Sequence, residues 1–267
     1  MRYSIITVNY NNKMGLIRTI ESVEKQTCKD YEYIIIDGGS DDGSVEVMKK
    51  YKKNITYCVS EPDKGIYNAM NKGILKSVGE YLIFMNSGDC FHDECVLEDM
   101  SIAGEGDILL GRVANVDTGG NVWSYNQEAE TISMYHFFIS TFPHQGCFIK
   151  RVLFEEHLYD ETLKIVADWK LFMEWVVFKG CTVLQSRRII TDCEPRGASL
   201  NASELQIEKD RILKEVIPYG IYKDYQYWSR FGVSTYADIA YVSHYPFLRK
   251  ILSHILKLMV YLHRQKK

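Results

Sequence analysis

Apolar runs alternate with amphipathic segments over the first 90 residues. Runs rich in β-branched and aromatic residues predict four strands, over 4–8, 33–36, 56–59 and 81–85. Between them, apolar residues recur at helical spacing and predict helices after an N-cap at Asn12, over 44–51 and over 66–76. Because strands and helices alternate and the central strands are apolar throughout, the pattern predicts a doubly wound α/β core.

The pattern is less regular after residue 100. It predicts a hairpin from 107–113 and 122–125, a helix over 169–178, a strand over 182–184 and a mostly solvent-facing helix over 203–217. A last helix is expected over 247–262, with apolar residues on one stripe and basic residues mainly on the other side.

Two interpretations of this basic C-terminal helix remain open. Its apolar stripe can pack on the body of the protein, as the stripes of surface helices usually do. Alternatively, the segment 244–267 can contact an anionic membrane surface peripherally. Charge bears on the second interpretation, since no acidic residue follows Asp238 and the basic residues after it are Arg249, Lys250, Lys257, Arg264, Lys266 and Lys267.

The composition narrows the classes of protein. A net charge of −3 gives no whole-chain argument for nucleic-acid binding. The seven cysteines are an odd set without a C-x-x-C pair, which favours reduced thiols over disulfides or a zinc site. No signal peptide and no apolar run of roughly 20 residues is found, so we expect a cytoplasmic protein.

Acidic loops follow two of the predicted strands. Asp37 opens the loop 37–43 after one apolar run, and Asn86, Ser87, Gly88 and Asp89 follow another. Parallel strands of an α/β sheet present their carboxyl ends at one edge, where such proteins bind ligands. The sequence therefore predicts a site there for a metal ion or for a polyhydroxylated, phosphorylated ligand.

Four segments, in this order, resemble the family 2 glycosyltransferases of the GT-A fold. They are SIITVNYN at 4–11, DGGSDDGS at 37–44, EPDKGIYNAMNKG at 61–73 and GEYLIFMNSGD at 79–89. The chain is most similar to the branch that builds bacterial exopolysaccharide and O-antigen repeat units. The resemblance implies a Rossmann-like, mostly parallel sheet flanked by helices, with a C-terminal helical extension. We expect a catalytic domain over 1–220, with a nucleotide-binding half (1–90) and an acceptor half (91–220), and a tail over 221–267.

The resemblance places the donor, a nucleoside diphosphate sugar, on the first half of the chain. Asp37 would accept a hydrogen bond from a uracil ring, which the match of the whole motif favours over the alternative of an Asx turn before Gly38. Asp63 and Lys64 would lie beside the base and ribose, or cap the next helix. The donor-binding residues implied are Thr7, Asn9, Asp37, Gly39, Ser40, Asp63, Lys64, Asn86, Ser87 and Gly88.

The segment Asn86–Asp89 stands where the family has its D-x-D motif, whose carboxylate binds Mn²⁺ or Mg²⁺ and through it the diphosphate. Hard oxygen ligands suit these ions. Here the first acidic position is Asn86 and the residue before Asp89 is Gly88, so Asp89 alone supplies a full charge. The resemblance implies metal binding through Asp89, with the diphosphate and waters completing the coordination.

Asp168 aligns with the catalytic base of the family, and it also stands where a helix N-cap is expected. A helix N-terminus favours the charged carboxylate, which keeps a base available. Contacts to phosphate or acceptor are expected, from the resemblance and from position beside the base, at His144, Gln145, Trp169, Arg196 and Ser199.

The implied reaction is a single inverting displacement on a nucleoside diphosphate sugar, UDP-linked in most relatives. The acceptor would be a saccharide hydroxyl, on a lipid carrier at the inner face of the cell membrane. The processive signature Q-x-x-R-W is missing, which indicates one transfer. A dehydrogenase would need G-x-G-x-x-G after the first strand, where the chain has no glycine. A nucleotide-sugar-binding protein of the same fold with impaired chemistry remains the alternative.

Overall fold

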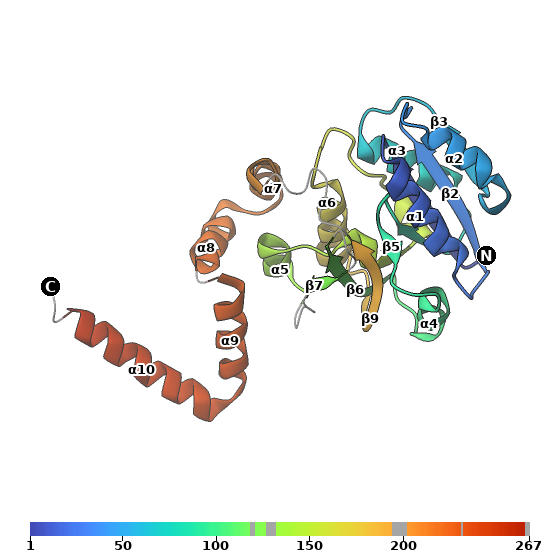
Figure 1. Cartoon of the computed structure of the whole chain (residues 1–267). Helices are drawn as coiled ribbons and strands as arrows, with labels where there is room; N and C mark the ends of the chain where they lie inside the picture. Colours follow the sequence, from blue (N-terminus) through green and yellow to red (C-terminus); the bar gives the residue numbers. More distant parts are fainter. Residues whose placement is uncertain (118–120, 127–131, 194–201, 231, 265–267) are drawn as a thin grey trace. The chain divides into compact units, whose positions relative to one another are not determined.

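Figure 1 shows the computed structural model of the chain, which describes residues 1–117, 121–126, 132–193, 202–230 and 232–264. The chain forms two compact units, Met1–Ile212 and Leu213–Lys267. The division falls inside helix α7 (Ala202–Val216). The domain boundary expected at residue 220 stays a prediction.

Four parallel strands form the first part of the sheet, in the order β3-β2-β1-β4. They are β1 (Tyr3–Asn9), β2 (Tyr31–Asp37), β3 (Tyr57–Ser60) and β4 (Tyr81–Phe84). Each lies within three residues of its predicted bounds. The side chains of β1, β4 and all of β2 except Tyr31 are buried on both faces, because helices cover the sheet from either side, whereas β3 at the edge is partly exposed.

Helices α1 (Lys13–Glu24) and α2 (Ser44–Lys50) lie against each other over one face of these strands (Figure 1). Helix α4 (Val96–Ile102) packs into the same apolar core. Helix α3 (Ile66–Lys76) contacts β1 and β2 from the opposite face, where a Cβ at Gly73 would lie 2.5 Å from Ile6. The Asn12 side chain caps α1 as expected, accepting from the Gly15 amide at 3.2 Å.

The second part of the sheet mixes directions. Strand β8 (Cys147–Lys150) runs antiparallel to β4, and β6 (Ile108–Val116) antiparallel to β8. The predicted hairpin is confirmed, since β7 (Val122–Tyr125) pairs antiparallel with β6. Strand β9 (Val183–Cys193) runs parallel to β6. The short strand β5 (Cys90–Phe91) pairs antiparallel with β9 at the edge of the sheet.

Strand β9 is eleven residues long, whereas the sequence indicated only 182–184. Its middle, Gln185–Arg188, is polar and partly exposed. No apolar run therefore marks this part of the strand in the sequence. The pairing with β6, and not local propensity, extends this strand.

Shorter elements complete the first unit. They are α5 (Met134–Ile139), α6 (Ala167–Met173), the π-helical turn η4 (Glu174–Phe178) that continues α6, and the 3₁₀ turns η1 (Lys52–Asn54), η2 (His144–Gly146) and η3 (Arg151–Phe154). The second unit contains α8 (Tyr219–Ser229), α9 (Gly232–His244) and α10 (Pro246–Arg264). Among the described residues, no helix combines the length and apolarity of a membrane span. All seven cysteines are free thiols, as expected.

Candidate active site

The strand order reverses between β1 and β4, because the chain adds β2 and β3 on one side of β1 and β4 on the other. The loops that follow parallel strands meet at the carboxyl edge, and a reversal opens a crevice there. A hydrogen bond of 2.7 Å spans this point, from Asn12 Nδ2 after β1 to the Ser87 carbonyl oxygen after β4. The predicted donor and metal residues therefore lie along one edge.

Asp37 ends β2 with a fully buried carboxylate. Its Oδ1 accepts from Asn9 Nδ2 and Ser40 Oγ, each at 2.6 Å. Its Oδ2 accepts from Ser60 Oγ at 2.6 Å and from the amides of Gly39 and Ser40 at 3.2 and 2.9 Å. Burial raises the pKa of Asp37, but these hydrogen bonds outweigh burial and lower it overall.

The Asp37 carboxylate thus holds the loop that begins at Gly38, as in the Asx-turn interpretation. A bond to a nucleotide base stays a prediction, and it requires the hydroxyl of Ser40 or Ser60 to turn away first. Gly39 has φ +82°, a left-handed conformation that favours glycine and lets its amide face the carboxylate.

Thr7 has no exposed side-chain surface, so nothing supports its expected place in the nucleoside pocket, which stays a prediction. It is fully buried and its hydroxyl lies 3.0 Å from that of Tyr33, because alternation along β1 turns it toward the core. Asn9 ends β1 and is 3% exposed, and its buried Oδ1 has no hydrogen-bond partner among the described residues. A buried amide oxygen without a partner is uncommon and indicates a ligand position.

The loop 61–65 lies close to the Asp37 loop. A Cβ at Gly38 would lie 2.5 Å from Asp63 Oδ2, so the glycine permits this approach. Asp63 Oδ1 accepts from the Gly65 amide at 2.9 Å, while the exposed Lys64 donates its backbone amide to Asn68 Oδ1 at 3.2 Å. Both side chains stay predictions as contacts of the base and ribose.

The loop Asn86–Asp89 follows β4 and is fixed by α1. Thr19 Oγ1 lies 2.7 Å from the Asp89 carbonyl oxygen and 2.9 Å from the Gly88 amide nitrogen. Gly88 has φ +110°, which a side chain would strain. The family resemblance predicts an acidic residue near this position of the D-x-D motif. The left-handed backbone conformation explains why this chain has a glycine directly before Asp89.

Asp89 is buried, and its carboxylate is hydrogen-bonded by the side chains of Cys193 and Gln145. Burial raises its pKa to about 6, against the opposing effects of these bonds and of His144. A cation beside Asp89 would offset the cost of this buried charge. Asn86 Oδ1 is a second oxygen at the loop and has no partner among the described residues.

These residues fit a hard divalent cation. Mg²⁺ in nucleotide enzymes is commonly held by one or two carboxylates, with substrate phosphates and waters completing the shell. The described residues contain no group of three or more His, Cys, Asp or Glu side chains that could hold a metal ion by themselves. Asp89 and Asn86 would each supply one oxygen, and phosphates and waters would complete the coordination.

His144 and Asp168 join this loop from distant parts of the sequence. Because β8 runs antiparallel to β4, the turn η2 before it lies at the edge where β4 ends. His144 Nε2 lies 3.2 Å from Asn86 Nδ2, and His144 Nδ1 lies 3.0 Å from Asp168 Oδ2. A neutral imidazole with its proton on Nδ1 satisfies both contacts, donating to Asp168 and accepting from Asn86.

Burial lowers the pKa of His144, but the hydrogen bond to Asp168 and the charges of Asp168 and Asp89 outweigh it, so that its pKa is raised overall. Asp168 lies in the first turn of α6, where its Oδ1 accepts from the Trp169 amide at 2.8 Å. Its side chain is 16% exposed, enough for an oxygen to meet a ligand.

Sequence reasoning gave Tyr67 and Lys209 no place beside the base. The Tyr67 hydroxyl lies 3.1 Å from Asp168 Oδ1 and 2.6 Å from the Ile165 carbonyl oxygen. Lys209 is buried, although most of α7 is exposed or half-buried, in keeping with the mostly solvent-facing helix expected. Its Nζ donates to the Ser140 carbonyl oxygen at 3.2 Å. A buried lysine inside a helix of charged residues has no distinguishing sequence pattern, because only tertiary packing selects it.

Lys209 also covers Trp169, with Nζ 4.9 Å from the ring centroid. The indole is 2% exposed and its Nε1 donates to the Phe137 carbonyl oxygen at 2.8 Å. Trp169 is thus a core residue, and its predicted contact with an acceptor has no exposed ring face to support it. Gln145 lies at Asp89, while Arg196 and Ser199 fall outside the described residues.

The buried Lys209 predicts a pH dependence of stability. Burial lowers its pKa to about 8, although the charge of Asp168 opposes the shift. Between pH 8 and 10 the unfolded chain therefore binds more protons at Lys209 than the folded chain, so stability contributed by this group rises with pH. From pH 7 to 9, the wild type should gain about 1 kcal/mol in free energy of unfolding relative to Lys209→Met. Urea denaturation at the two pH values measures this difference, and equal changes in both proteins would contradict it.

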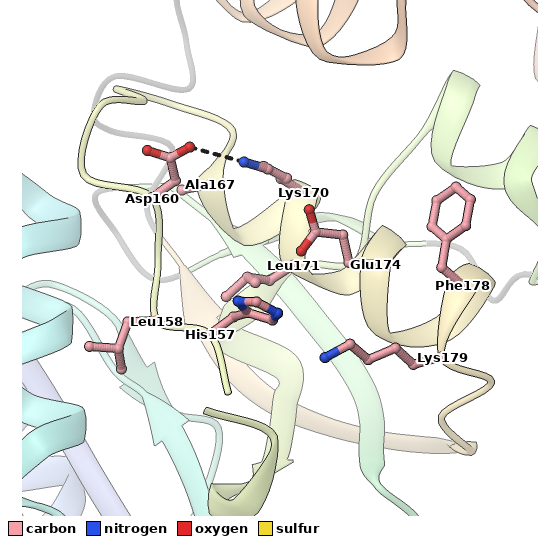
Figure 2. Close-up of a pocket in the computed structure, with 9 residues that line it drawn as sticks. All are labelled: His157, Leu158, Asp160, Ala167, Lys170, Leu171, Glu174, Phe178 and Lys179. Carbon is pink, nitrogen blue, oxygen red and sulfur yellow. Dashed lines mark hydrogen bonds and ion pairs between the residues drawn. The ribbon is translucent and has the colours of Figure 1, made fainter. Parts of the chain in front are cut away.

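A separate hollow of about 480 Å³ lies on another side of α6. Figure 2 shows the ion pair of Asp160 and Lys170 at its rim, 3.0 Å apart, with Glu174 and Lys179 nearby. None of the predicted site residues lines it. The carboxyl edge of the sheet, and not this hollow, collects the predicted chemistry.

Comparison with known proteins agrees with this architecture. The profile of "Glycosyl transferase family 2" matches residues 4–178. An uncharacterized glycosyltransferase of Mycobacterium tuberculosis is 43% identical over 89 residues, 33% of this chain and 34% of that protein. A PGL/p-HBAD biosynthesis glycosyltransferase of Mycobacterium bovis is 27% identical over 175 residues, which cover 62% of this chain and 66% of the length of that relative.

A third relative is the poly(ribitol-phosphate) β-N-acetylglucosaminyltransferase TarP of Staphylococcus aureus, 35% identical over 129 residues, 45% of this chain and 39% of TarP. The chain thus spans between about a third and two thirds of the length of these relatives.

Two solved structures show the same fold. Staphylococcus aureus TarS 1–349 in complex with UDP-GlcNAc superposes with a TM-score of 0.61 at 16% identity, over 86% of this chain and 72% of that one. The mannosyltransferase PcManGT of Pyrobaculum calidifontis, in complex with GDP-Man and Mn²⁺, superposes with a TM-score of 0.61 at 14% identity. The match covers 97% of this chain and 80% of PcManGT. The fold is the expected GT-A fold. With the family profile covering most of its length, the chain belongs to glycosyl transferase family 2.

Proposed function

We propose that this protein transfers one sugar from a nucleoside diphosphate sugar, UDP-linked, to an acceptor hydroxyl with inversion of configuration. The observation that carries the proposal is the convergence of Asn86, His144 and Asp168 in one hydrogen-bonded chain, beside the buried carboxylate of Asp89. These residues come from three segments far apart in the sequence. The fold does not need such a chain of polar side chains at a sheet edge, so we interpret it as part of a functional site.

In the proposed reaction the donor lies across the carboxyl ends of β1, β2 and β4, with its base near Asn9 and its diphosphate at the loop Asn86–Asp89. Asp89 and Asn86 would hold Mn²⁺ or Mg²⁺. The bound ion would supply positive charge against the charge that develops on the departing diphosphate. Asp168 accepts the proton of the acceptor hydroxyl as that oxygen attacks the anomeric carbon, and His144 fixes the orientation of the carboxylate.

The relatives support the choice of donor and metal. TarS is known in complex with UDP and with UDP-GlcNAc, and PcManGT in complex with GDP-Man and Mn²⁺. The acceptor is proposed to be a saccharide on a lipid carrier, in cell-surface polysaccharide synthesis at the cytoplasmic face of the membrane. The names of the relatives, with poly(ribitol-phosphate) and PGL/p-HBAD biosynthesis, point to cell-envelope products.

Donor binding is tested by calorimetry with UDP and by a panel of UDP-sugars assayed for hydrolysis. Wild-type protein should bind UDP more tightly with Mn²⁺ and should hydrolyse at least one UDP-sugar. Asn9→Leu should weaken UDP binding about tenfold, because it removes the unpartnered Oδ1. Thr7→Val is the matched control on the same strand, since its hydroxyl faces Tyr33 in the core and its loss should leave UDP affinity unchanged.

The same panel separates the alternative, a nucleotide-sugar-binding protein without chemistry. That protein would bind UDP and a UDP-sugar but hydrolyse and transfer none. Absence of UDP binding, or equal affinity of wild type and Asn9→Leu, would contradict the proposed donor site.

A further inference from the structure

Helix α10 exposes a continuous apolar surface. Its stripe comprises Leu248, Ile251, Leu252, Ile255, Leu258, Met259 and Leu262. At 3.6 residues per turn, Phe247 and Leu256 extend its two margins, so the apolar surface covers roughly half of the helix circumference. Most of these side chains are well exposed; Ile255 is 49%, Leu258 57% and Met259 61% exposed. An apolar surface of this length needs a partner.

The opposite half of α10 is basic. Lys250 and Lys257 project from it and are exposed, and Arg249 flanks the stripe. The last 29 residues hold six lysines and arginines and no acid, whereas residues 1–238 hold 26 basic and 35 acidic side chains, a net charge of −9. The segment that carries the exposed apolar stripe is thus net positive, whereas the rest of the chain is net negative.

We propose that α10 binds an anionic lipid surface, lying in the plane of the interface with its stripe toward the acyl chains. Exposed lysines on the polar half and Arg249 at the margin then reach lipid phosphates. The inference rests on α10 alone and holds whether or not the proposed sugar transfer is correct.

Two observations favour lipid over a second copy of this chain. A helical pair buries a narrow seam of two positions per heptad, and a stripe half the circumference wide would leave much apolar surface in water. Pairing would also bring together two helices of the same positive charge without an acidic side chain to balance them. Phe247, at the margin of the stripe, is 73% exposed, and aromatic side chains are common on the apolar face of helices that lie in a membrane interface.

The test is co-sedimentation of the full chain with vesicles of phosphatidylcholine alone and with about one third phosphatidylglycerol. The wild type should bind the anionic vesicles, and salt should weaken this binding. Ile255→Asp should weaken it at least about tenfold, because it places a charge inside the stripe. Ser253→Asp is the matched control, since it adds the same charge on the exposed polar side and should weaken binding much less.

Charge is tested by the double variant Lys250→Gln/Lys257→Gln, which should bind anionic vesicles about 20- to 30-fold more weakly. The control Lys53→Gln/Lys164→Gln removes two exposed lysines from the first unit and should bind as the wild type does.

Three outcomes would overturn the proposal. The wild type does not sediment with anionic vesicles; Ile255→Asp and Ser253→Asp bind equally well; or the wild type is a dimer that Ile255→Asp converts to a monomer, with no vesicle binding by either. Circular dichroism of the variants shows that the helix content is retained. UDP-sugar hydrolysis in solution, which requires no vesicle, distinguishes a failure of this inference from a failure of the proposed reaction.

Discussion

Asp168→Asn is expected to lower the rate of sugar transfer by about 10²- to 10⁴-fold, the range lost when a positioned base is removed. Asparagine keeps an oxygen at the place of Oδ1, which accepts from the Trp169 amide and lies near the Tyr67 hydroxyl. The backbone and the packing of α6 should therefore persist, while the negative charge that accepts the proton is lost. Steady-state rates with the best UDP-sugar of the panel measure the effect, with the loss in kcat and little change in UDP affinity.

The matched control for Asp168 is Asp192, which forms a second histidine–aspartate pair among the described residues of the first unit. His92 Nδ1 lies 2.7 Å from Asp192 Oδ1, and the pair is more exposed than His144 and Asp168. Asp192→Asn removes the same charge from the same kind of partner but should leave the rate within about twofold, as expected of a surface substitution. Unchanged turnover in Asp168→Asn would remove this residue from the reaction.

Asp89→Asn is expected to abolish the enhancement of UDP binding by Mn²⁺ and to lower kcat/KM by at least about 100-fold. The amide has nearly the same shape, but it cannot supply the full negative charge that the proposed metal site needs. Calorimetric titration with UDP, with and without Mn²⁺, measures the first effect. Thermal melts give a second readout, because ions that bind only the folded protein raise its melting temperature.

The stability of Asp89→Asn should change in the opposite direction to its activity. Burial raises the pKa of Asp89 to about 6, so the ionised carboxylate is held at a cost in the metal-free protein. The neutral amide should leave that protein at least as stable as the wild type. Asp160→Asn, which removes a carboxylate paired with Lys170 outside the site, is the control and should keep the Mn²⁺ response. UDP binding that depends on neither Mn²⁺ nor Asp89 would remove the metal assignment.

Helices and strands of the first 90 residues could be predicted closely because each has a local cause. Apolar runs fixed the positions of β1 to β4, and the cap at Asn12 marked the start of α1. Beyond residue 100 the causes are distant in sequence. Strand β9 is long because β6 pairs with it, and the two-residue β5 exists only by its pairing with β9.

The candidate site divides in the same way. Residue type and order pointed to Asp37 and Asp89, since carboxylates after apolar strands are visible in the sequence, and the family resemblance pointed to Asp168. Their environments were not visible. The saturation of Asp37 by five hydrogen bonds depends on Asn9 and Ser60, from two other strands. Alternate side chains of β1, such as Tyr3 and Ile5, face α1 in the apolar core. Thr7 continues this row, so its hydroxyl meets that of Tyr33 in the core.

The sequence by itself determined the family, the parallel first half of the sheet and the basic amphipathic character of the C-terminal helix, because periodicity, motif order and charge are properties of the chain as written. Only the tertiary structure decided that His144 lies between Asn86 and Asp168 and that Lys209 is buried against Trp169. The antiparallel entry of β8 beside β4 and the packing of α7 create these contacts. The residues joined are 24 to 58 positions apart, and no local propensity encodes the approach of such distant segments.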